Sequence, residues 1–249
     1  MRSTPVISIM WIDTRQRSQE TEIMDDFALA GETLRHSLDE IARINHWLGG
    51  NRITLSGVSR LVSSIQPHKP VRIWDLGCGN GDMLRMLARW GRTQGIKLDL
   101  LGIDANADTI AYAEELSANY PEIRYLCTVL PDPELENQST DIVLCTLFLH
   151  HFSDEDIATL LKRFAPRTEV GIVVNDLQRS KLAYFLFSLL TWFHSNKMVR
   201  EDGLLSILRG FHRTELQNLA KRLPNWRSGI KWRWAFRYQW ILQPPAEAS

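Results

Sequence analysis

The sequence has no excess of one charge, few cysteines and no long apolar stretch. Its 249 residues include 29 basic and 29 acidic side chains, so the charge balance does not suggest a nucleic acid as the partner. The three cysteines stand far apart without paired spacing, which argues against disulfides or a zinc site and predicts no bound metal. The longest uncharged apolar run covers only 12 residues, 182–193, whereas a membrane span needs about 20. The N-terminal residues show no pattern of a signal peptide, so we expect a cytoplasmic protein.

The spacing of apolar residues divides the chain into segments. Residues 1–22 are polar and unpatterned, and we predict a mobile tail there. Apolar residues at three- and four-residue steps predict helices over 25–48 and 54–66, which end at Gly-Gly and Pro residues respectively. We therefore assign residues 1–52 to a tail and helical cap, and residues 53–249 to the main domain.

The middle of the chain alternates short apolar runs with helical patterns. The runs lie at residues 71–76, 98–103, 123–127, 141–147 and 170–175. This alternation predicts an α/β fold whose strands pair in parallel through right-handed crossovers. Aromatic and polar residues alternate over 230–240, which indicates half-buried β structure, either one long strand or a hairpin near Trp234-Ala235.

The most informative segment covers residues 71–82, Val-Arg-Ile-Trp-Asp-Leu-Gly-Cys-Gly-Asn-Gly-Asp. A strand leads into three glycines at alternate positions and then into a helix; these are Gly77, Gly79 and Gly81. Glycines there let the backbone turn sharply, approach a ligand and present free N–H groups. A dinucleotide-binding loop needs glycine where Asp82 stands, and Asp75 would repel a pyrophosphate. A carboxylate instead suits a ligand with an ammonium and a sulfonium, which is the charge pattern of S-adenosylmethionine.

A second acid follows the next predicted strand. Asp104 lies 23 residues beyond Gly81, near the spacing of about 20 residues at which an acid reaches the hydroxyl pair of a ribose. The alternative is that Asp104 caps the helix that begins near Ala107. The glycine loop and this acid together predict a nucleoside site more strongly than either does alone.

These segments resemble the motifs of the class I S-adenosylmethionine-dependent methyltransferases. The resemblance rests on Asp75-Leu-Gly-Cys-Gly-Asn-Gly81, Gly102-Ile-Asp104 and Asp141-Ile-Val-Leu-Cys145, and it covers residues 50–180. It implies a Rossmann-like seven-stranded sheet, mostly parallel with an antiparallel C-terminal strand, an N-terminal helical cap, and S-adenosyl-L-methionine as the cofactor.

The resemblance also implies roles for single residues. Asp75 and the three glycines would hold the methionine end of the cofactor, Asp104 the ribose, and Ala105 would lie beneath the adenine. Many members carry a Gly-Asp pair after the third strand, whose acid meets the adenine amino group. Here Cys127-Thr128 occupies that place, and Thr128 offers a hydroxyl as an acceptor. Thr146, at the end of the fourth predicted strand, completes the expected cofactor contacts.

A narrower resemblance points to small-molecule enzymes. Its segments are Arg43-Ile-Asn-His-Trp-Leu-Gly-Gly50, Val174-Asn-Asp-Leu-Gln-Arg-Ser180 and Glu201-Asp-Gly-Leu-Leu-Ser-Ile-Leu-Arg-Gly-Phe211. They are similar to bacterial methyltransferases associated with polyketide genes, which belong with the ubiquinone- and menaquinone-type enzymes. This similarity implies a small-molecule methyl acceptor.

Three polar residues after the fourth and fifth predicted strands are candidates for catalysis. Ligands of doubly wound sheets gather beyond the carboxyl ends of the strands, where His150, His151 and Asp176 are expected. An unperturbed imidazole titrates near pH 6.5, which suits it to accept a phenolic proton; we place His151 ahead of His150, and His194 last. The alternative is structural, with the histidines capping a helix and with Asp176 and Arg179 tying loops together.

Residues 182–193 hold five aromatic side chains among leucines. They form either a buried helix or, with the 25–48 helix, an apolar wall for the acceptor. We predict methylation of a hydroxyl on an aromatic, quinone-like or polyketide compound. A nicotinamide-dependent oxidoreductase, which Asp75 and Asp82 argue against, and a non-catalytic cofactor-binding module are the alternatives. A nucleic-acid methyltransferase would need a basic surface, but we interpret the one basic cluster as the solvated face of a strand: Arg227, Lys231, Arg233 and Arg237.

Overall fold

A computed structural model of the chain describes residues 12–65, 69–133, 135–192 and 196–245. Its centre is a seven-stranded sheet with the order β3-β2-β1-β4-β5-β7-β6. The strands are β1 (Val71–Leu76), β2 (Leu98–Asp104), β3 (Ile123–Cys127), β4 (Thr140–Thr146), β5 (Thr168–Leu177), β6 (Arg227–Arg233) and β7 (Arg237–Gln243). Strands β1 to β5 pair in parallel, whereas β7 runs antiparallel to both β5 and β6. The predicted seven-stranded, mostly parallel sheet is therefore confirmed.

The C-terminal β structure is a hairpin rather than one long strand. Ala235 and Phe236, between β6 and β7, have φ angles of 58° and 53°, which places both in the left-handed region that tight turns require. Strand β7 is almost fully buried, whereas the edge strand β6 is mostly exposed. The hairpin thus supplies one core strand and one solvent-facing edge.

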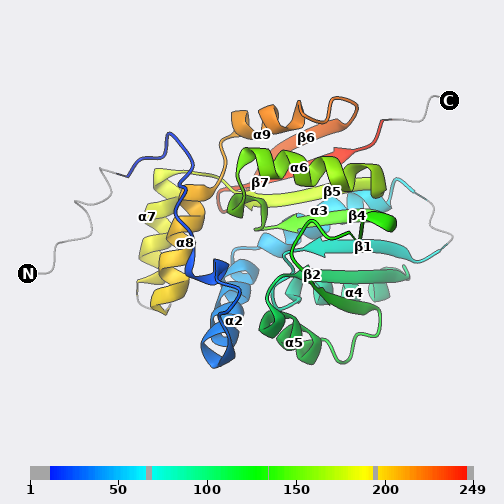
Figure 1. Ribbon diagram of the computed structural model, residues 1–249, viewed down its shortest axis with the longest axis horizontal. Helices are drawn as coiled ribbons and strands as arrows, with labels where there is room; N and C mark the ends of the chain where they lie inside the picture. The colour runs from blue at the N-terminus through cyan, green and yellow to red at the C-terminus, as the bar shows by residue number, and fades with distance from the viewer. Residues whose placement is uncertain (1–11, 66–68, 134, 193–195, 246–249) are drawn as a thin grey trace, which may run out of the picture.

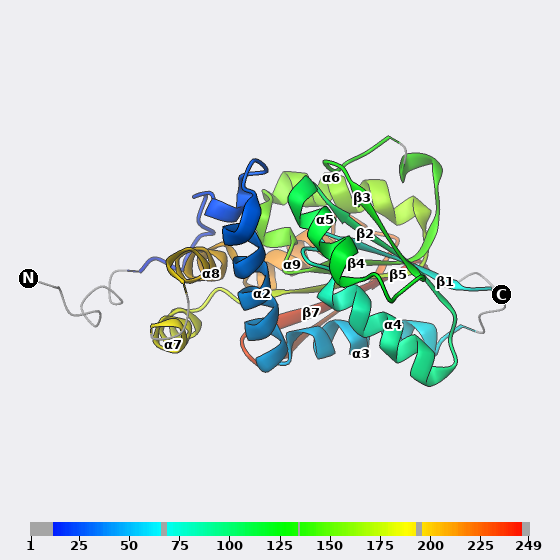
Figure 2. The same ribbon diagram turned by 90° about the horizontal axis from the view of Figure 1, so that it is seen from below.

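Helices cover both faces of the sheet (Figures 1 and 2). Apolar side chains of α3 (Gly50–Val62), α4 (Asp82–Gln94) and α5 (Ala107–Leu116) pack on one face. Those of α6 (Asp154–Phe164) and α9 (Arg213–Ala220) pack on the other. Local chemistry fixes where these helices begin, since the Ser153 side chain accepts a hydrogen bond from the Asp156 N–H at the start of α6. No helix among the described residues is long and apolar enough to cross a membrane.

Three helices form a cap at one end of the molecule, on the same side in both ribbon views. They are α2 (Gly31–Trp47), α7 (Lys181–Thr191) and α8 (Lys197–Arg209). Helix α2 begins six residues later than the sequence pattern suggests, because a 3₁₀ turn at Ile23–Asp25 and an extended stretch precede it. The cap therefore combines residues before and after the parallel strands, and a division of the chain at residue 52 stays a prediction.

The segment before the cap is held in place where it is described. The Ser18 N–H donates to the Leu208 carbonyl at 3.1 Å, and the Arg17 guanidinium donates to the carbonyls of His150 and Phe152 at 2.9 and 2.8 Å. The expected mobile tail is thus wrong for residues 12–22, because polar side chains without any periodic pattern make specific long-range contacts. Residues 1–11 lie outside the described part of the chain.

Candidate active site

A cavity of about 750 Å³ separates the carboxyl ends of the parallel strands from the cap helices. Nearly all the residues singled out from the sequence line it: Asp75, Gly77, Gly79, Asp104, Ala105, Thr128, Thr146, His150 and His151. Two others do not face it directly. Gly81, the last loop residue before α4, is not among the lining residues, and Asp176 lies behind His150.

The glycine loop has the backbone geometry that its sequence predicts. Gly77, Gly79 and Gly81 have φ angles of 69°, 53° and 76°, which residues with a Cβ rarely adopt. A Cβ at Gly77 would lie 2.2 Å from the Phe148 ring, and one at Gly81 would lie 2.1 Å from the Tyr125 hydroxyl. Glycine is therefore required both by the conformation and by the close packing around the loop.

Asp104 anchors this loop instead of capping the following helix. Its Oδ2 accepts from the Gly79 N–H and its Oδ1 from the Asn106 N–H, both at 3.1 Å. The N-cap of α5 is Asn106, whose side chain accepts from the Thr109 N–H. The capping interpretation of Asp104 is thus wrong, and its carboxylate is positioned at the cavity wall.

Three carboxyl groups meet at this end of the cavity. Burial raises the pKa of Asp75 well above its ordinary value, and the neighbouring Asp82 and Asp104 carboxylates raise it further. Burial also raises the pKa of Asp82 and of Asp104. Asp75 Oδ1 is buried and has no hydrogen-bond partner among the described residues, an arrangement that is costly unless a donor or cation occupies the site. A ligand that carries an ammonium and a sulfonium would supply the missing positive charge, so these residues fit S-adenosylmethionine.

The two threonines are held by neighbours that the sequence did not reveal. The Thr128 hydroxyl donates to Asp132, which leaves its oxygen lone pairs as acceptors. Thr146 Oγ1 lies 3.0 Å from Thr54 Oγ1 of α3. Sequence reasoning also missed Asn51, which donates to Asp82 Oδ2 at 2.6 Å. None of these partners belongs to a recognisable motif.

The histidines lie on a short 3₁₀ turn, Leu149–His151, just after β4. His150 Nδ1 is 2.7 Å from Asp176 Oδ1, and both side chains are almost fully buried. His151 is more open, with 27% of its side chain exposed, and its Nδ1 lies 2.7 Å from Asp25 Oδ1. The two rings lie 4.1 Å apart. The structure therefore gives each histidine its own carboxylate and brings all three predicted catalytic candidates together.

Two of these carboxyl groups are held in the ionised form. Burial alone would raise the pKa of Asp176, but its electrostatic interaction and hydrogen bond with His150 lower it below its ordinary value. Burial opposes ionisation of Asp25 as well, yet His151 and Arg209 lower its pKa. Arg209 Nη1 donates to Asp25 Oδ2 at 2.7 Å, and its Nη2 donates to the His151 carbonyl at 2.6 Å. Asp25 and Arg209 were not recognisable from the sequence, because they lie far from the histidines along the chain.

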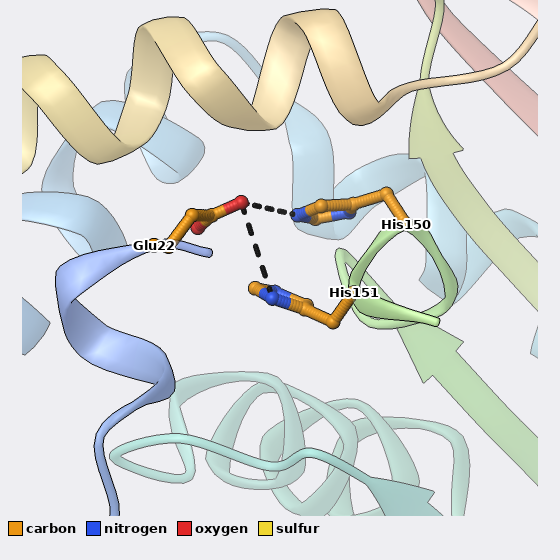
Figure 3. A group of neighbouring side chains, drawn as sticks. All are labelled: Glu22, His150 and His151. Atoms are coloured by element: carbon orange, nitrogen blue, oxygen red, sulfur yellow. Dashed lines mark ion pairs between the residues drawn. The ribbon is translucent and has the colours of Figure 1, made fainter. Parts of the chain in front are cut away.

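Glu22 is the third acidic group beside the histidines. Its Oε1 lies 3.6 Å from His150 Nε2 and 3.9 Å from His151 Nδ1. Figure 3 shows the three side chains pointing toward one another from two separate segments, one on either side of the gap between them. One ligand-type atom of each residue lies within 4.8 Å of the other two.

The remainder of the cavity is mostly apolar. Much of its apolar lining comes from α2, α7 and α8 and includes Leu34, Leu38, Ile41, Leu186, Phe187, Leu190, Val199 and Ile207. Helix α7 is not an ordinary buried helix, because Leu182 and Leu189 on its outer side are 55% and 59% exposed. One side of α7 instead lines the cavity, which agrees with the alternative that it forms an apolar wall.

Three other sequence interpretations are decided by burial. Arg179 is a structural tie, with its guanidinium donating to the carbonyls of Thr14 and Gly210 and to Glu215. Arg237 is not on a solvated strand face: it is 3% exposed, and burial lowers its pKa to about 10. This burial removes one residue from the only basic cluster noted in the sequence. His194 lies outside the described residues.

Comparisons with known proteins indicate which family and which solved structures the chain resembles. Residues 73–171, from β1 to the start of β5, match the family described as "Methyltransferase domain". No curated protein matches the chain. The plantazolicin methyltransferase BpumL, solved in complex with SAH, has a TM-score of 0.63 at 18% identity over 85% of this chain and 89% of its own. An O-methyltransferase family protein from Burkholderia thailandensis has a TM-score of 0.62 at 15% identity over 97% of this chain and 68% of its own.

A third solved structure is the CMeT domain of the citrinin polyketide synthase, with a TM-score of 0.57 at 15% identity over 78% of this chain and 52% of that chain. At such identities these likenesses show the fold. The family match covers the strands and the loop that build the acidic end of the cavity. Residues 73–171 therefore match a methyltransferase domain, and the seven-stranded fold around them is that of solved methyltransferases.

Proposed function

We propose that this enzyme methylates a hydroxyl group of a small, largely apolar acceptor, of the aromatic, quinone-like or polyketide type. The observation that carries the proposal is a single cavity with two chemically different parts. One end is acidic and suits the cofactor, whereas the other is largely apolar and has the histidine pair among its polar groups. Apolar pockets with a few convergent polar groups are typical of small-molecule sites.

In this proposal the acidic end holds the cofactor. Asp75, beside the glycine loop, faces the positive charges of the methionine part, and Asp104 accepts hydrogen bonds from the ribose hydroxyls. Ala105 and Thr128 contact the adenine, and Thr146 lies near the reacting end. The bound cofactor supplies an electrophilic methyl group for in-line transfer, so the protein contributes chiefly by aligning the acceptor and excluding water.

His151 is the proposed proton acceptor. Its Nδ1 faces Asp25, which leaves Nε2 as the ring nitrogen for the acceptor hydroxyl, and its side chain is open to the cavity. His150 is enclosed between Asp176 and Glu22 and is only 3% exposed, so we assign it and Asp176 to positioning. General-base catalysis of this kind contributes about 10²–10⁴-fold in rate.

The solved neighbours support a natural-product acceptor but do not select the atom. BpumL was also solved with desmethylPZN analogues and SAH, and another neighbour is described as the CurJ carbon methyltransferase. The choice of oxygen rests on the histidine pair, since proton removal matters most when the acceptor is a hydroxyl.

The test is methyl transfer from labelled S-adenosylmethionine to a panel of phenols, hydroxyquinones, amines and carbon acids. We expect turnover with the hydroxyl compounds, and His151→Gln should lower kcat by about 10²-fold or more while the affinity for S-adenosylhomocysteine stays the same. The exposed His36 is the matched control, and His36→Gln should behave as wild type. Turnover confined to amines or carbon acids would contradict the hydroxyl proposal. Cofactor binding without any turnover would favour a non-catalytic module.

A further inference from the structure

The segment of residues 12–25, here called the N-terminal strap, is fastened over the histidine turn. Asp202 of α8 accepts from the N–H groups of Ile23 and Met24 at 2.8 and 3.0 Å. Arg17 donates to the carbonyl of His150. The strap therefore has a defined position relative to the histidines, and this position brings Glu22 into the site.

Glu22 is buried without a hydrogen bond for one of its oxygens. The residue is 7% exposed, and its Oε1 has no hydrogen-bond partner. His150 Nε2 and His151 Nδ1, which face this oxygen, are shielded from solvent in the same way. Three enclosed polar atoms that face one another leave room for a proton or a small cation rather than for a larger ligand.

The geometry favours a proton between Glu22 and His150. His150 Nδ1 is 2.7 Å from Asp176 Oδ1, so that nitrogen carries the ring proton and Nε2 is left as an acceptor. Two acceptors, Nε2 and Glu22 Oε1, then face each other at 3.6 Å. Burial raises the pKa of Glu22 to about 7, so its carboxyl group can supply the missing proton near neutral pH.

Other charged and polar groups surround Glu22 from each element packed against it. Arg209 of α8 has its Nη1 at 3.9 Å from Oε1, the Ser206 hydroxyl of the same helix forms a hydrogen bond that favours ionisation, and Asp25 of the strap opposes it. One guanidinium thus faces two carboxyl groups, those of Glu22 and Asp25. Buried charge of this kind is stabilised by retaining a proton.

A metal ion fits these atoms less well. His151 Nδ1 is in ion-pair contact with Asp25 Oδ1 at 2.7 Å, so this nitrogen already has a carboxylate partner. The distances of 3.6 and 3.9 Å from Glu22 Oε1 also exceed the separation of about 3.3 Å between tetrahedral ligands with bonds near 2.0–2.1 Å.

We propose that Glu22 is a positioning residue of the active site, which shares a proton with His150 Nε2 and, once ionised, stabilises the imidazolium of His151. The inference rests on the proposed function, in which His151 accepts the acceptor's proton. In that step an oxygen–methyl bond forms, the sulfur–methyl bond breaks, and the hydroxyl proton passes to His151 Nε2. The positive charge thereby moves from the sulfonium to an imidazolium that faces Glu22, and the N-terminal strap becomes part of the catalytic site.

The test compares Glu22→Gln with the exposed neighbour Glu20→Gln as control. The glutamine amide imitates protonated Glu22 and still donates to His150 Nε2, so the fold should persist. We expect the kcat–pH midpoint to fall by about one unit, since one of the two carboxylates that face His151 is gone. At neutral pH kcat should drop about tenfold, whereas affinity for S-adenosylhomocysteine should not change. Glu20→Gln should match wild type in all three measurements.

A second measurement needs no acceptor and separates this inference from the proposed function. Nitrogen-15 NMR of the imidazoles should show the Nδ1–H tautomer of His150 in both proteins, and a titration near pH 7 sensed by His150 in wild type but absent from Glu22→Gln. If these signals are observed but no hydroxyl is methylated, the result contradicts the proposed function and leaves the role of Glu22 in place. Unchanged signals and an unchanged kcat–pH profile would overturn the role of Glu22. So would one equivalent of zinc retained after dialysis by wild type and not by Glu22→Gln.

Discussion

Replacing Asp75 by asparagine should weaken cofactor binding and, in the same protein, stabilise the ligand-free fold. The Asp75 carboxylate is buried, lies near Asp82 and Asp104, and has one oxygen without a hydrogen bond. A hydrogen bond between a buried charge and a cationic ligand contributes about 1.5–3 kcal/mol, which is a factor of about 10–150 in Kd. Removing this buried, unsatisfied carboxyl group from the ligand-free protein should raise the free energy of unfolding by about 1–3 kcal/mol.

The pH dependence gives an independent check. Because burial raises the pKa of Asp75, Asp82 and Asp104 in the folded protein, their contribution to stability is fully present below their unfolded pKa and is lost as pH rises through the raised values. The ligand-free enzyme should therefore become less stable above about pH 4. The cationic cofactor should bind more tightly as pH rises and should release protons on binding.

Two assays measure these effects. Titration calorimetry of S-adenosylmethionine in buffers of different ionisation enthalpy gives Kd and the number of protons released, and urea unfolding gives the stability of the ligand-free protein. The control is Asp99→Asn, an exposed carboxylate of β2 that pairs with Arg124. If Asp75→Asn binds the cofactor as wild type does, or if it destabilises the ligand-free protein, the electrostatic account of the cofactor site is refuted.

Three further changes test other parts of the structure. Gly81→Ala should reduce both stability and cofactor affinity, because its φ of 76° disfavours a Cβ and that atom would meet the Tyr125 hydroxyl. Unfolding and calorimetry measure the two effects, and wild-type values in both would show that the loop accepts a Cβ at this position. Arg179→Met should lower the free energy of unfolding by about 3 kcal/mol, because it breaks the contact with Glu215. The kcat measured on folded protein should stay within twofold of wild type, as expected for a residue that holds loops together and is not catalytic. Phe187→Ala should raise KM for an apolar acceptor about tenfold or more without changing the Kd of the cofactor. Equal effects on KM and on this Kd would show that Phe187 does not line the acceptor part of the cavity.

The acidic end of the cavity, which we propose for the cofactor, could be predicted from the sequence because its determinants are local. Asp75 and Asp104 lie near the carboxyl ends of the neighbouring parallel strands β1 and β2, and the three glycines lie on the loop after β1. Their order along the chain therefore already places them side by side. The alternation of apolar runs and helical patterns likewise predicts a parallel sheet. A pattern of alternating residues could not distinguish a strand from a hairpin at the C-terminus, since the left-handed turn there uses Ala235 and Phe236 rather than glycine.

The acceptor half was decided by the tertiary structure. The sequence predicted that His150, His151 and Asp176 lie at the same sheet edge. Only the folded structure shows that Asp176 pairs with His150 and Asp25 with His151. Glu22 and Asp25 belong to a segment with no periodic pattern and meet the histidines across more than a hundred residues of chain. Backbone turns and apolar periodicity are written within single segments, whereas the pairing of buried charges depends on which segments the folded core brings together.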